Sequence, residues 1–248
     1  MTEEGKYIYS IIQETQDRKF DSIGINNREV SLVHYKDISA VVSSTPIVNF
    51  DRLDKKELIS HVATHQKVNE EIMKEYDVVP MAFGIIAPLT SEVSRILEKA
   101  YLQFKTALEK IKGKAEFAVQ VWWNPQKLLE ELVSINPEIQ KLKQEASSKK
   151  GILAMSIKLK LGKLIQKEVE VQREAFVKDI QVFLNSLSHD STSNKLIEDD
   201  MIANFSFLIE KAKEPELDKK MQELGKKYEG KLRFKYIGPM PPYSFVNI

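Results

Sequence analysis

The hydrophobic pattern of the first 50 residues is typical of β-strands. Residues 6–13 form a nearly continuous aromatic and β-branched run, which predicts a strand buried on both faces. Two shorter apolar runs, residues 30–35 and 38–43, predict two further strands, with a tight connection at Lys36-Asp37. The chain therefore opens with β structure before the spacing of its apolar residues changes.

Helical and strand-like periods then alternate. Apolar residues every three or four positions predict one helix over residues 51–76 and a second over residues 90–111. Residues 78–86 and 115–123 predict the strands that follow each helix. This order of elements predicts an α+β domain of ferredoxin-like character over residues 1–124.

The pattern of the second domain, residues 125–248, is dominated at first by helix. Helical spacing continues from residue 125 to about residue 189. Apolar residues alternate over residues 153–161, as in a strand, but the flanking segments are rich in strong helix formers. We therefore predict a long helical arm over residues 152–187.

The remaining sequence predicts a return to mixed structure. Residues 186–194 are polar and turn-like. A strand over residues 201–209, a helix over 215–228 and a strand over 232–237 then follow from the apolar spacing. The prolines of the tail, residues 238–243, exclude a helix there.

Composition and charge narrow the possible functions. The chain has 37 Lys and Arg against 36 Asp and Glu, so no overall positive field attracts nucleic acid or anionic lipid. It has no cysteine, which excludes disulfides, thiolate metal sites and cysteine nucleophiles and fits a reducing cytoplasm. The first residues are polar, and no apolar run approaches the roughly 20 residues of a spanning helix, so neither a signal peptide nor a membrane span is expected.

Two histidines are the best candidates for metal chemistry. His61 and His65 are four residues apart and share one face of the first predicted helix. Val62 stands where helical zinc proteases carry glutamate, and the sequence indicates no third ligand. The alternative is that His65 belongs to the buried stripe and His61 is more exposed, and we favour it. We therefore expect no cofactor and no catalytic residue.

Three other features are candidates for contact with a partner. Trp122 and Trp123 end a predicted strand and must point to opposite faces, so one fits the core, and the other either packs under the helical arm or forms a binding surface. The tail, residues 239–245, either packs back on the protein as a strap or is presented for recognition. The arm carries an apolar stripe beside lysines, which suits either the core or a partner. Its candidate residues are Leu159, Leu161, Leu164 and Ile165.

Five segments are spread in order over essentially the whole chain: Tyr7-Ile-Tyr-Ser-Ile-Ile12, His61-Val-Ala-Thr-His-Gln-Lys-Val68, Val78-Val-Pro-Met-Ala-Phe-Gly84, Glu116-Phe-Ala-Val-Gln-Val-Trp122 and Gly238-Pro-Met-Pro-Pro-Tyr-Ser-Phe-Val246. In this order and spacing they resemble the gas vesicle protein F/L family, and the C-terminal segment is the most specific of them. Ala82 and Met240 depart from the family pattern, which often has a basic residue and an aromatic residue at these places.

The resemblance implies both a fold and a function. The fold is two α+β domains, the first ferredoxin-like and the second a modified, helix-rich ferredoxin-like domain. The function is that of a non-catalytic accessory protein in gas vesicle formation. It would bind the hydrophobic shell subunit and other accessory proteins, in the cytoplasm and in association with the vesicle.

Two other functions are compatible with parts of the sequence. One is a metal-dependent hydrolase that uses His61 and His65. The other is an RNA-binding module, because ferredoxin-like sheets resemble RNA-recognition domains. The near-neutral charge and the lack of a basic aromatic motif argue against RNA binding.

Overall fold

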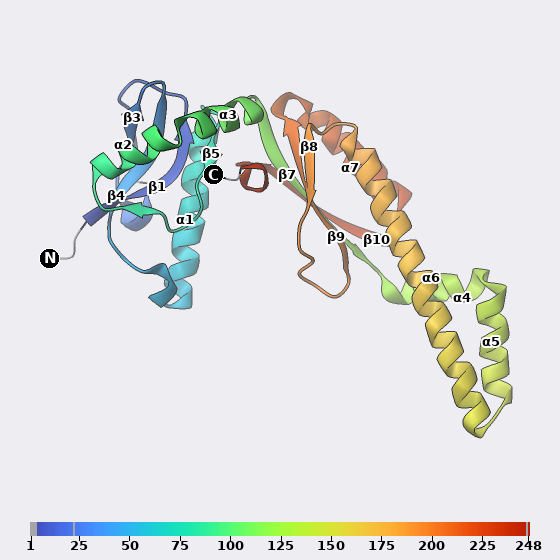
Figure 1. The fold of residues 1–248 in the computed structure, drawn as a ribbon. Helices are drawn as coiled ribbons and strands as arrows, with labels where there is room; N and C mark the ends of the chain where they lie inside the picture. The colour runs from blue at the N-terminus through green and yellow to red at the C-terminus, as the bar shows by residue number, and fades with distance from the viewer. Residues whose placement is uncertain (1–3, 22, 247) are drawn as a thin grey trace. The chain divides into compact units, whose positions relative to one another are not determined.

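The computed structural model describes residues 4–21, 23–246 and 248, with Asp51 described for its backbone only. The α+β class is confirmed, and the strands form two antiparallel sheets (Figure 1). The chain divides into two compact units. The predicted domain boundary at residue 124 stays a prediction. Unit 1 consists of Met1–Glu116, Leu208–Ala212 and Gly238–Ile248, and unit 2 of Phe117–Phe207 and Lys213–Ile237.

The first sheet has its longest strands at its centre. Its order is β2-β3-β4-β1-β5, and β6 also pairs with β1. The tight turn between β3 and β4 places Lys36 in the left-handed region, at φ +53°. The strands are β1 Glu4–Ile12, β2 Lys19–Phe20, β3 Val30–Tyr35, β4 Ile38–Pro46, β5 Val79–Pro80 and β6 Ile86–Ala87.

Helices cover both faces of this sheet, which explains the continuous apolar run in β1. Tyr7 and Tyr9 lie in a core cluster with residues of α1, whereas Ile8 and Ile11 lie in a cluster with residues of α2 and α3. A β-bulge between Ile8 and Ser10 changes which residues face each side. The helices are α1 Lys55–Met73, α2 Thr90–Lys99 and α3 Tyr101–Ile111.

Three predictions for unit 1 are wrong in detail. The helix predicted from residue 51 begins at Lys55, where Asp54 accepts hydrogen bonds from two backbone amides, after a short 3-10 turn. The strand predicted over residues 78–86 is two short strands, because Gly84 adopts φ +94° between them. The second helix is broken at Ala100, which has φ −101° and ψ 14°.

The second sheet has the order β10-β7-β9-β8. Strand β8 corrects the prediction of a turn over residues 186–194, because its polar residues give no apolar alternation. The long helix is confirmed, and no described helix is both long and apolar enough to cross a membrane. The strands are β7 Lys114–Trp123, β8 Asp190–Ser193, β9 Met201–Glu210 and β10 Leu232–Met240, and the helices are α4 Pro125–Ile135, α5 Pro137–Ser148, α6 Gly151–Asn185 and α7 Glu214–Lys227.

Helix α6, the predicted arm, has different neighbours along its length. Its first half packs beside α4 and α5 (Figure 1). Its last turns are buried at Ile180 and Leu184, and Asp179 accepts hydrogen bonds from Lys227 and Tyr228. The second half of α6 is therefore anchored to α7, and the first half belongs to a bundle of three helices.

Candidate partner-binding surfaces

The inner face of the arm is part of a small apolar core. Leu161, Leu164 and Ile165 are half-buried and pack against a buried cluster on α4 and α5. That cluster consists of Leu128, Leu132 and Ile139. Three of the six predicted partner-binding residues thus have only part of their surface free in this conformation.

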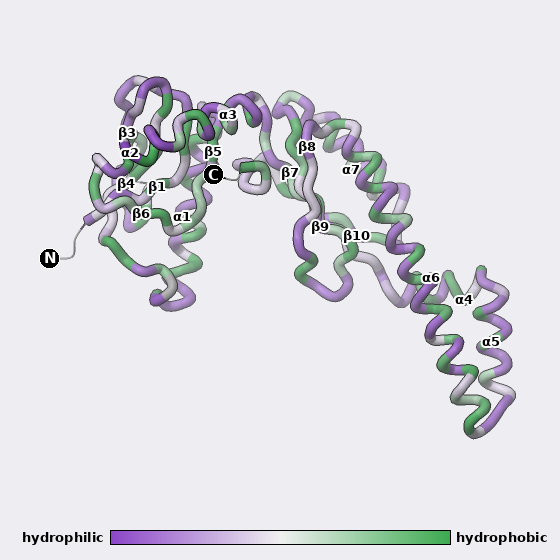
Figure 2. Tube along the Cα trace, in the orientation of Figure 1, coloured by the Kyte–Doolittle hydropathy of each residue, from purple (hydrophilic) through white to green (hydrophobic). Residues whose placement is uncertain are grey.

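The outer face of the same helix is apolar and exposed. Ile152 is 90% exposed, Met155 66% and Leu159 61%. These positions are three and seven residues from Ile152, so their side chains leave the helix on one side. Figure 2 shows hydrophobic positions alternating with hydrophilic ones along this part of α6. We call these three residues the outer stripe.

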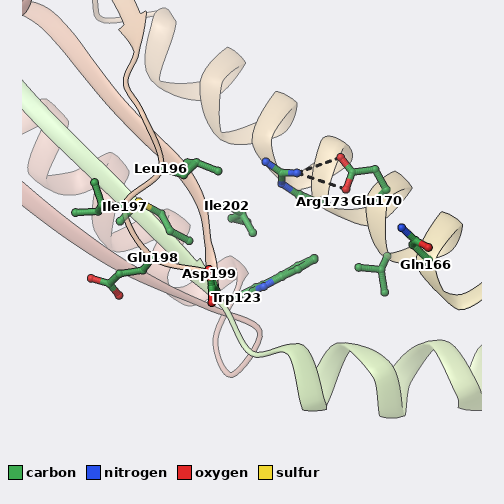
Figure 3. Close-up of a pocket in the computed structure, with 11 residues that line it drawn as sticks. Trp123, Gln166, Glu170, Arg173, Leu196, Ile197, Glu198, Asp199 and Ile202 are labelled. Carbon is green, nitrogen blue, oxygen red and sulfur yellow. Dashed lines mark hydrogen bonds and ion pairs between the residues drawn. The ribbon is translucent and has the colours of Figure 1, made fainter. Parts of the chain in front are cut away.

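The other end of the predicted site is a pocket beside Trp123 (Figure 3). Its volume is about 450 Å³. Trp123, at the end of β7, lines the pocket together with Leu196 and Ile197 of the β8–β9 loop, and on the α6 side Arg173 pairs with Glu170 at 3.1 Å. Ile197 in this loop is 66% exposed. The lining of the pocket therefore combines apolar and charged side chains.

The two tryptophans have different environments, as their adjacent positions predict. Trp122 is buried, and its indole Nε1 donates to Glu198 at 2.8 Å. The Arg233 guanidinium lies 4.0 Å from the centre of its ring. Trp123 is half-buried and packs against the core of the helix bundle. Only Trp123 therefore offers surface to the pocket.

The two histidines lie in an aromatic cluster in unit 1. His65 is 3% exposed, with Tyr7 Oη 2.9 Å from Nδ1 and Asn69 Nδ2 3.2 Å from Nε2. His61 is also buried, and its Nε2 lies 3.7 Å from Glu57. His61 is 8% exposed against 3% for His65, so it is the more exposed of the two, as expected, although both are buried. Among the described residues, no group of three or more acidic or histidine side chains could hold a metal ion.

Burial controls the ionisation of this cluster. It lowers the pKa of His65 to about 4, against a smaller opposing effect of a hydrogen bond with the Met81 backbone. Burial also raises the pKa of Tyr243 to about 12 and raises that of Tyr7. His65, Tyr7 and Tyr243 are therefore neutral near pH 7.

The C-terminal tail packs on unit 1, as the strap hypothesis predicts. Asn69 Nδ2 donates to Tyr243 Oη at 2.8 Å, although these residues are 174 positions apart. The buried Glu116 carboxylate accepts from the Ser244 amide at 2.8 Å and from its hydroxyl at 2.6 Å. Phe245 is itself buried. These contacts fix the tail beside α1.

Tyr243→Phe is expected to destabilise the protein by about 1 kcal/mol, because the Asn69 amide loses one acceptor in a buried place. Urea denaturation measures the change. Tyr35→Phe is the matched control, because its hydroxyl forms only an exposed bond of 3.3 Å to Glu98. Equal effects of the two substitutions would contradict a structural role for the tail contact.

Sequence patterns did not reveal several of these residues. Asn69 and Tyr243 meet only through the fold, and Glu198 stands in a loop with no periodicity. The outer stripe could have been found from the sequence, because Met155 and Leu159 follow Ile152 by three and seven residues, which is the spacing of one helix face.

Comparison with known proteins agrees with this fold. Residues 5–247 match the family model described as gas vesicle synthesis protein GvpL/GvpF. Gas vesicle protein F of Microcystis aeruginosa is 28% identical, with 98% of each chain covered. Gas vesicle protein F1 of Halobacterium salinarum is 27% identical, with 99% of this chain and 94% of that protein covered. The crystal structure of GvpF from Anabaena sp. PCC7120 matches with a TM-score of 0.84 at 20% identity, covering 99% of each chain.

The chain therefore belongs to the GvpL/GvpF family of gas vesicle proteins. The resemblance drawn from the ordered sequence motifs is confirmed over nearly the whole chain. The role of the protein lies in gas vesicle formation.

Proposed function

We propose that the protein acts in gas vesicle formation by binding the hydrophobic shell subunit and other accessory proteins, without a catalytic step. The proposed place of action is the cytoplasm, as the sequence resemblance implies. The outer stripe of α6 carries the proposal, because it exposes three large apolar side chains on a helix of an accessory protein. Such a surface shields an apolar partner, and the lysines beside it keep the protein in solution.

The six candidate residues divide between two places in unit 2. Leu159 is the exposed member of the outer stripe, and the half-buried Leu161, Leu164 and Ile165 lie on the opposite side of the same helix. We propose that their accessible edges add to the contact. Trp123 would provide a second contact at its pocket, and the hydrogen bond of the buried Trp122 to Glu198 would fix the end of the strand there.

A pull-down with the purified shell subunit and the other accessory proteins of the vesicle tests this function. The full-length protein is expected to retain at least one of them. Retention of none would reject the proposal.

The competing metal-dependent hydrolase requires free ligands at His61 and His65. The two ring nitrogens of His65 already lie within hydrogen-bond distance of Tyr7 and Asn69. Elemental analysis of protein purified without a histidine tag distinguishes the two functions. Stoichiometric metal would favour the hydrolase.

A further inference from the structure

The free end of the helix bundle concentrates positive charge. Residues 141–167 run from α5 through the first half of α6 and contain a single acidic residue, Glu145. The whole chain has a net charge of only +1, so the rest of the protein is acidic on balance. We call residues 141–167 the basic hairpin. Its eight lysines are Lys141, Lys143, Lys149, Lys150, Lys158, Lys160, Lys163 and Lys167.

These charges are not neutralised within the protein. All eight lysines are exposed, and none forms an ion pair with the described part of the chain. Some lysines elsewhere do form such pairs: Lys105 lies 2.7 Å from Asp37, and Lys227 lies 2.7 Å from Asp179. The basic hairpin therefore differs from the rest of the protein in the sign of its net charge, and that charge is left unneutralised.

The lysines border the outer stripe. At 100° per residue, Lys158 lies to one side of Ile152, Met155 and Leu159, and Lys160 lies to the other. Lys163 follows the stripe at its end. Seven residues separate Ile152 from Leu159, so the apolar contact is about 10 Å long. This is the length of two helical turns with charges along both edges.

We propose that the basic hairpin binds an acidic amphipathic helix of a partner protein. The partner would place its apolar residues on the outer stripe and its carboxylates opposite the lysines, as the flanking charges of paired helices do. The inference rests on the proposed function, since it names the kind of accessory partner that this face of the arm accepts. Charge complementarity also increases the association rate and makes binding sensitive to salt.

An anionic membrane is the main rival partner. Basic amphipathic helices that lie on membranes usually insert aromatic residues at the interface. Residues 141–167 contain no Trp, Tyr or Phe, and the outer stripe is only two turns long. These observations favour a protein helix.

A designed peptide pair tests the proposal with the full-length protein. One labelled amphipathic helix carries leucines flanked by glutamates, and the second carries lysines in place of those glutamates. Fluorescence anisotropy at about 150 mM salt should show binding of the acidic peptide only, weakened about tenfold or more by higher salt.

Charge-reversed variants locate the site. Replacement of Lys158, Lys160 and Lys163 by Glu is expected to weaken binding of the acidic peptide at least tenfold. The matched control changes three exposed lysines outside the hairpin, and it should weaken binding less than twofold. The control substitutions are Lys219→Glu, Lys226→Glu and Lys235→Glu.

Three results would overturn the inference. They are equal binding of the two peptides, equal effects of the two triple variants, and tighter binding to phosphatidylglycerol vesicles than to the acidic peptide. The shell-subunit pull-down with wild-type protein runs in parallel. Retention of the shell subunit without acidic-peptide binding rejects this inference alone, whereas retention of no vesicle protein rejects the proposed function.

Discussion

Lowering the pH from about 7.5 to 4.5 is expected to destabilise the protein by about 2–3 kcal/mol, through protonation of a single buried histidine. Burial lowers the pKa of His65 from 6.5 to about 4. Between these two values the unfolded chain binds a proton that the folded protein excludes, so the free energy of unfolding falls as the pH falls. Below about pH 4 the folded state also accepts the proton, and this contribution becomes constant.

Urea denaturation at several pH values measures this effect, with His65→Gln as the control. The substitution removes the titrating group, so the variant should lose most of the pH dependence above pH 4.5, whatever its stability at pH 7.5. Hydrogen bonds from Lys105 and Lys227 lower the pKa values of Asp37 and Asp179 below their usual range, so these carboxylates contribute mainly at lower pH. Parallel pH profiles for the two proteins would contradict the assignment to His65.

The double substitution Leu161→Ala with Leu164→Ala is expected to cost about 2–5 kcal/mol. A fully buried Leu→Ala change costs about 2–5 kcal/mol by itself, and these two side chains are half-buried against the bundle core. The melting temperature should fall by roughly 5–15 °C. Leu153→Ala with Leu159→Ala is the matched control, since these residues are 57% and 61% exposed and should cost less than about 1 kcal/mol.

Measuring how tightly the same variants bind the shell subunit shows whether Leu161 and Leu164 act in the protein core or at an interface. An unchanged melting temperature with lost binding for the Leu161 and Leu164 variant would show that these leucines act mainly at the interface. Unchanged binding by the folded variant would confine them to the core.

The alternating apolar residues of α6 show why part of the site was predictable and part was not. The alternation of apolar and polar residues shows which positions are candidates for contact with a partner. The strong helix formers on either side show that these positions lie on a helix. On a helix, however, residues two apart are about 200° apart, so Leu159 faces outward and Leu161 inward. The sequence pattern cannot show which side has a neighbour until α4 and α5 are placed.

The fold follows the same logic. The continuous apolar run of β1 correctly predicts a strand covered on both faces, but not the bulge at Ile8 and Ser10 that changes the facing residues. Strand β8 is polar and lies at the edge of its sheet, so no apolar period marks it. The contact between Asn69 and Tyr243 joins distant positions, and local spacing carries no information about it.

The most direct test of partner binding through the arm is the Kd of the shell subunit for wild-type protein and for a variant of the outer stripe. The variant replaces Ile152, Met155 and Leu159 by Ser. Because these side chains are exposed, the melting temperature should stay within a few degrees of wild type. Each apolar side chain buried at an interface contributes about 1.5–3 kcal/mol. If the outer stripe binds the shell subunit, the Kd of the variant should therefore be higher by roughly two orders of magnitude or more. An unchanged Kd for this stable variant would contradict it.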